Sequence, residues 1–179
     1  MNAVARAPVA IQTAQASPVS ALRRRLEELM RLVLTLPVEA YCARTSRVSG
    51  SIGEHVRHVL DHISSLVAAC PSAVLSYDHR ARGTGVETEP SAAVREMMRL
   101  DAALERWDNR SLDEPVAVVA LVSTNGQSVN GWSTLARELA FVMSHTIHHQ
   151  AIVALLLEQQ GTDVPDERFG FAPSTPQRN

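Results

Sequence analysis

Residues 51–62 read Ser51-Ile-Gly-Glu-His-Val-Arg-His-Val-Leu-Asp-His62 and combine a helix start with three histidines. Ser51 and Glu54 form the capping-box pattern, in which two side chains satisfy the first free amides of a helix. The apolar residues between the histidines recur at helical spacing. We therefore predict a helix over residues 52–69 whose start is fixed by the sequence itself.

The chain has a second histidine window in His145-Thr-Ile-His-His149, inside the last long apolar segment. Histidines three and four residues apart share one face of a helix, because 3.6 residues make one turn. An i,i+4 pair can reach one divalent ion, and a third imidazole from another helix leaves an open coordination position. Burial of several unpaired imidazoles is costly, which favours a metal site over satisfied core histidines. The candidates are His55, His58, His62, His145, His148 and His149, six of the seven histidines of the chain.

Three further helices are expected. The first covers residues 22–36, the third residues 91–107, and the fourth starts at Ser133 or Thr134 and ends before Gly161, a good helix stop. A long loop over residues 72–90 separates the second helix from the third. The predicted fold is all-α, a four-helix bundle, which builds metal sites from side chains that face its interior.

Residues 115–133 have a different pattern. Val116 to Val122 is β-prone, Asn125-Gly126 is a strong turn signal, and Val129 to Trp132 returns as a second strand. This predicts a small hairpin between the third and fourth helices. We expect residues 1–17 to be a disordered tail, residues 18–161 to form the bundle, and residues 162–179 to pack on it as coil.

The composition excludes several classes of function. The 179 residues include 17 basic ones, and none is Lys, so no amine is available for a Schiff base or a Walker-type loop. A net charge of -2 argues against nucleic-acid binding. Cys42 and Cys70 form no paired motif, and no continuous apolar run has the roughly 18 residues of a membrane span. We expect a cytoplasmic protein without a membrane partner.

Residues near the histidines suggest supporting roles. Thr146 follows His145 where the metalloprotease signature has Glu, so that mechanism is absent. Asp61 and Glu138 are candidates to orient an imidazole, although ordinary pairing on a helix surface explains each equally well. The long loop carries charges that would suit a substrate lip or, more commonly, a solvated surface: Asp78, Arg80, Arg82 and Glu87.

These motifs resemble the DinB-like superfamily of four-helix metalloproteins. Ser51 to His58 is similar to the start of the family's second helix, where one ligand follows the Gly-Glu pair, and His145 to His149 is similar to its closing motif. The resemblance implies that His58, His145 and His149 bind the metal. His55, His62 and His148 then remain additional or supporting histidines, and His62 could replace His58. Gln150-Ala-Ile152 departs from the Arg-Gly-Gln of many relatives.

The resemblance also implies a reaction. Relatives with assigned activities include metal-dependent transferases and isomerases that use low-molecular-weight thiols, so we expect one divalent ion, zinc or nickel, that activates a thiol toward a small electrophilic substrate. Manganese and iron also accept imidazole ligands. The alternatives are a hydrolase that uses metal-activated water and a non-catalytic metal- or ligand-binding module. A homodimer is expected by analogy with helical-bundle relatives.

Overall fold

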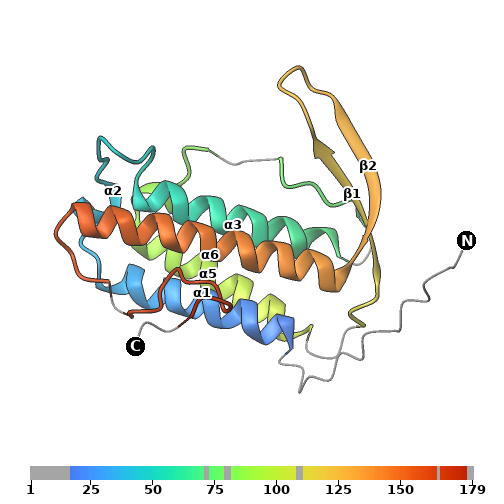
Figure 1. Ribbon diagram of the computed structural model, residues 1–179, viewed down its shortest axis with the longest axis horizontal. Coiled ribbons are helices and arrows are strands. Elements are labelled where there is room, and N and C mark those ends of the chain that lie inside the picture. Colours follow the sequence, from blue (N-terminus) through green and yellow to red (C-terminus); the bar gives the residue numbers. More distant parts are fainter. Residues whose placement is uncertain (1–16, 71–72, 79–81, 108–110, 165, 177–179) are drawn as a thin grey trace, which may run out of the picture.

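Four long helices form a bundle in the computed structural model, which describes residues 17–70, 73–78, 82–107, 111–164 and 166–176. They are α1 (Pro18–Thr35), α3 (Ile52–Ala69), α5 (Pro90–Glu105) and α6 (Leu135–Gln159). Both α1 and α3 pack against α5 and α6, so α1 and α3 lie diagonally across the bundle (Figure 1). The helical bundle predicted from the sequence is confirmed.

The core lies between these four helices. Each helix contributes leucines that are at most 1% exposed, such as Leu29 of α1, Leu66 of α3, Leu100 of α5 and Leu156 of α6. Burial of one such side chain contributes about 1.5–3 kcal/mol. This apolar interior holds α3 and α6 side by side, and all six clustered histidines lie on those two helices.

The longest helix, α6, ends where the sequence predicts. Gly161 follows it with φ +68°, a left-handed conformation that glycine adopts without a steric penalty. By length and mean hydropathy α6 is also apolar enough to cross a membrane, a property that buried core helices share. In this bundle α6 contacts both α1 and α3, and it buries residues along its whole length from Leu135 to Leu157.

The capping box at the start of α3 is confirmed. The Ser51 hydroxyl accepts from the Glu54 amide, and the Glu54 carboxylate accepts from the Ser51 amide. Two short helices beside it were not predicted, α2 (Val38–Cys42) and α4 (Gly85–Thr88), the second inside the long loop. At Gly53 an added Cβ would lie 2.1 Å from the Glu87 carbonyl oxygen, so this glycine lets α4 approach α3.

The predicted hairpin is confirmed as β1 (Pro115–Leu121) and β2 (Ser128–Thr134), an antiparallel pair joined at a turn where Gly126 has φ +87°. It projects away from one end of the bundle (Figure 1). Leu75 of the long loop forms a parallel bridge with Val118, which ties that loop to the hairpin. At the other end of the chain, Phe169 is 3% exposed and packs into the core.

Candidate metal centre

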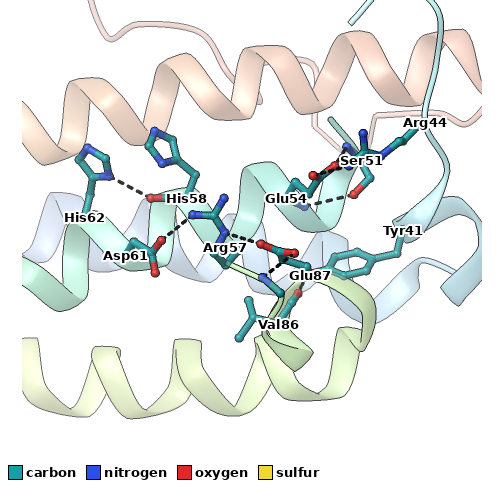
Figure 2. A network of polar contacts seen from close by, with 11 residues as sticks. Tyr41, Arg44, Ser51, Glu54, Arg57, His58, Asp61, His62, Val86 and Glu87 are labelled. Atoms are coloured by element: carbon teal, nitrogen blue, oxygen red, sulfur yellow. Dashed lines mark hydrogen bonds and ion pairs between the residues drawn. The ribbon is translucent and has the colours of Figure 1, made fainter. Parts of the chain in front are cut away.

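The histidines of α3 face α6. In Figure 2 the side chains of His58 and His62 rise from α3 toward α6, whereas Arg57 and Asp61 lie on the side nearer α4. The histidines lie three and four residues apart along α3, so they share one side of the helix and leave Arg57 and Asp61 on another. Arg57 donates to Asp61 at 2.6 Å and to Glu87 at 2.9 Å, so the charged side of α3 is bound to α4.

The histidines of α3 and α6 form an imidazole ladder, a name we use for His55, His58, His62, His145 and His149. The two helices run antiparallel, because His62 lies beside His145 with ring centroids 3.9 Å apart, and His55 lies beside His149 at 5.2 Å. His58 lies between the two ends. Its ring centroid is 4.9 Å from that of His145 and 4.6 Å from that of His149. Two sequence windows about 90 residues apart thus build one continuous cluster.

Three histidines of the ladder have the geometry of a metal site. One ring nitrogen from each of His58, His62 and His145 lies within 4.8 Å of the others. Two nitrogens bound to one zinc ion are at most about 4.2 Å apart, because each Zn–N bond is about 2.1 Å. The side chains would have to rotate to bring the three nitrogens onto one ion. Three neutral imidazoles are also a donor set that divalent transition metals accept, so the residues present fit such an ion.

Backbone carbonyls orient both ends of the ladder. At the end nearer the hairpin, which we call the inner end, Nδ1 of His62 lies 3.0 Å from the carbonyl oxygen of His58. At the outer end, Nε2 of His55 lies 2.9 Å from the carbonyl oxygen of Ser49, and its Nδ1 lies 3.0 Å from Nδ1 of His149. Hydrogen bonds to backbone carbonyls therefore orient the rings of His62 and His55.

Burial keeps the outer imidazoles neutral. Burial, and after it the neighbouring rings of His145 and His58, lower the pKa of His149 from 6.5 to about 2. Burial also lowers the pKa of His55, although the Ser49 carbonyl opposes this shift. Metal binding requires the neutral imidazole, whose lone pair is the ligand. His149 and His55 are therefore neutral at neutral pH.

Aromatic rings close the inner end. Tyr77 from the long loop stacks on His62 with centroids 5.1 Å apart and planes 8° apart, and Phe141 lies 6.0 Å from His145. The Tyr77 hydroxyl donates to Glu138 at 2.9 Å, and that carboxylate also accepts from Ser133. Burial and the Glu138 charge raise the pKa of Tyr77 well above its usual range. The phenol stays protonated and donates.

The remaining candidates, His148, Asp61 and Glu138, lie outside the ladder. His148 is exposed, and its ring lies 5.3 Å from that of His149. Asp61 accepts from Arg57 and Glu138 from Tyr77, so the carboxylates contact those side chains.

Three of the four proposed lip residues, Asp78, Arg82 and Glu87, lie in the part of the chain that the structure describes. The Asp78 carboxylate accepts from the Leu121 amide of β1, and Glu87 accepts from Arg57 beside α4. Arg82 is exposed, and Arg80 lies outside the described residues. The structure therefore attaches two members of the set to different elements.

Sequence reasoning missed Tyr77, Phe141 and Arg57. Phe141 had a usable signal, because it lies one helical turn before His145 on the same face. Arg57 had one too, since it stands four residues before Asp61. Tyr77 lies in a loop without periodicity. Long-range contacts, such as the bridge of Leu75 to the hairpin and the hydrogen bond of Tyr77 to Glu138, hold it beside His62.

Comparison with known proteins identifies related sequences. The model of the DinB family matches residues 18–174. A protein of Rhizopus delemar described as FK506-binding protein 5 is 32% identical over 103 residues, which cover 57% of this chain and 26% of that protein. The chain thus spans about a quarter of the length of this relative.

Proposed function

The chain belongs to the DinB family, and from this premise we propose that it is an enzyme that uses one divalent metal ion, zinc or nickel, to activate a low-molecular-weight thiol. The observation that carries the proposal is the group of His58, His62 and His145 within 4.8 Å. His58 and His145 also belong to the ligand set that the family resemblance implies, so these two are the ligands we propose first. The third is His62 on geometry or His149 on resemblance.

The chemistry follows from the donor set. A divalent ion held by neutral imidazoles lowers the pKa of a bound thiol and so supplies thiolate near neutral pH. In this proposal the thiol proton leaves to solvent. The sulfur forms a bond to an electrophilic carbon of the second substrate while the bond from that carbon to its leaving group breaks, and the leaving group departs with the electron pair. Tyr77 and Phe141 cover the inner end with apolar rings, which limits the access of water from that side.

The side chains around the ladder supply positioning. His62 is 5% and His149 8% exposed, so both rings are fixed by packing. The exposed His148 and the half-buried His55 lie at the outer end, and we place the entry of substrate there. Neither Cys42 nor Cys70 belongs to the ladder, so the reacting sulfur comes from a separate small molecule.

The test uses untagged protein. Elemental analysis is expected to find about one divalent ion per chain, and the loaded protein is expected to consume an electrophile only when a low-molecular-weight thiol is present. A panel of thiols is paired with one electrophile, with His145→Ala as the inactive variant and His148→Ala as the matched control. Absence of metal after incubation with zinc and nickel would overturn the proposal. Turnover with water alone would replace it by a hydrolase, and metal binding without turnover by a binding module.

A further inference from the structure

The ring centroids of the ladder form two triangles that share one edge. His58 and His145, 4.9 Å apart, form this edge. His62 lies 4.5 Å and 3.9 Å from them on one side. His149 lies 4.6 Å from each of them on the other side. Both rings therefore lie beside the central pair. The group whose ring nitrogens lie within 4.8 Å of one another contains His62, and the His149 ring would have to rotate to join it.

The hydrogen bond of His62 fixes which of its ring nitrogens carries the hydrogen. A carbonyl oxygen can only accept, so Nδ1 of His62 carries the hydrogen and donates to the His58 carbonyl at 3.0 Å. The neutral ring then has its lone pair on Nε2. An imidazole that donates one N–H to a backbone carbonyl while the other nitrogen binds metal is the usual arrangement of metal-ligating histidines.

The same reasoning fixes His149 through His55. The Ser49 carbonyl can only accept, so Nε2 of His55 carries hydrogen, and Nδ1 of this neutral ring is an acceptor. Nδ1 of His149, 3.0 Å away, must therefore be the donor. His149 is left with its lone pair on Nε2, in the same tautomer as His62. His55 thus does for His149 what the His58 carbonyl does for His62.

We propose that the metal is held by four imidazoles, those of His58, His62, His145 and His149, and that His55 is a positioning residue that fixes the tautomer of His149. This inference rests on the proposed metal binding and deepens it. Four protein ligands fill a tetrahedral ion, so a substrate position remains only on an ion that accepts five or six ligands.

The decisive measurement uses the wild-type chain with zinc as the probe. Protein labelled with ¹⁵N-histidine is titrated with Zn²⁺, and the ring nitrogen signals are recorded by NMR. We expect four imidazoles to show metal-shifted Nε2 signals with protonated Nδ1 at His62 and His149. His55 is expected to keep its Nε2–H and to show no metal shift. Three shifted rings, or a shifted His55, would overturn the four-imidazole assignment.

Affinity measurements test the same point with variants. His62→Ala and His149→Ala are each expected to weaken Zn²⁺ binding by at least about 10-fold, with His148→Ala as the matched control. If either variant binds as tightly as wild type, that histidine is not a ligand and the inference fails. If the wild-type chain itself shows no metal-shifted imidazole, the proposed function fails together with it.

The role of His55 has its own pair of variants. Asn and Leu have nearly the same shape, but only Asn offers an acceptor to Nδ1–H of His149. We expect His55→Leu to weaken Zn²⁺ binding by about 10–100-fold, as loss of an outer partner does, and His55→Asn to restore most of the affinity. Equal affinities for the two variants would show that His55 acts through packing alone and would overturn its positioning role.

Discussion

The inner and outer ends of the imidazole ladder hold the same type of residue in different ways. At the inner end, His62 donates to a carbonyl of its own helix and is covered by the Tyr77 ring. At the outer end, His149 depends on His55 of another helix, which in turn depends on Ser49 in the loop before α3. The inner end is therefore fixed mainly by local helix geometry, and the outer end by successive tertiary contacts.

The largest expected effect on metal affinity comes from His145, which lies in the central pair of the ladder. His145→Ala removes a member of both triangles, so we expect metal affinity to fall by more than the roughly 10–100-fold that loss of an outer partner costs. His148→Ala, three residues further on α6, is expected to bind as wild type. Calorimetric titration with Zn²⁺ measures both. The opposite order would show that the other face of α6 carries the site.

The second largest expected effect is on stability, at the inner end of the ladder that Tyr77 and Phe141 cover. Glu138 is 2% exposed and accepts from Tyr77 and Ser133, so Glu138→Ala leaves two hydroxyl donors without their acceptor. We expect the free energy of unfolding to fall by about 1–3 kcal/mol, since an unsatisfied buried group costs about 1–3 kcal/mol and both hydroxyl groups are half-buried.

Glu158→Ala, at an exposed position of the same helix, is the control, with an expected change within about 0.5 kcal/mol. Urea unfolding of both variants measures the difference. Equal midpoints for the two variants would show that the hydrogen bonds of Glu138 add nothing to the inner end.

The smallest expected effect is the acid sensitivity of the outer end in metal-free protein. The pKa of His149 is lowered from 6.5 to about 2 in the folded chain. Above about pH 6.5 the ring is neutral in both states. Below it the unfolded chain takes up a proton that the folded chain resists, so stability is lost as the pH falls. We expect the melting temperature to be a few degrees lower at pH 5.5 than at pH 7.5.

His149→Leu removes this titrating group and is expected to flatten the profile between those two pH values. The comparison is made by thermal unfolding of metal-free wild type and variant. An unchanged slope in the variant would show that the acid sensitivity arises elsewhere in the chain.

Local signals in the sequence were sufficient for the long helices and the hairpin. The capping box of Ser51 and Glu54, the stop at Gly161 and the turn at Asn125-Gly126 all act within a few residues, and the structure has each of them. The short helices α2 and α4 have no such signal. They are held by tertiary contacts, such as the hydrogen bond from the Tyr41 hydroxyl to the Val86 carbonyl at 2.7 Å.

Helical periodicity is a local property, so the spacing of the histidines was enough to predict that His55, His58 and His62 share one helix face. The same holds for His145 and His149 on the last helix. Only the tertiary structure decided that these faces meet in antiparallel order, with His62 against His145 and His55 against His149. It also placed Tyr77 on the ladder. Distances between helices depend on how the whole apolar core packs, and no spacing within one segment encodes them.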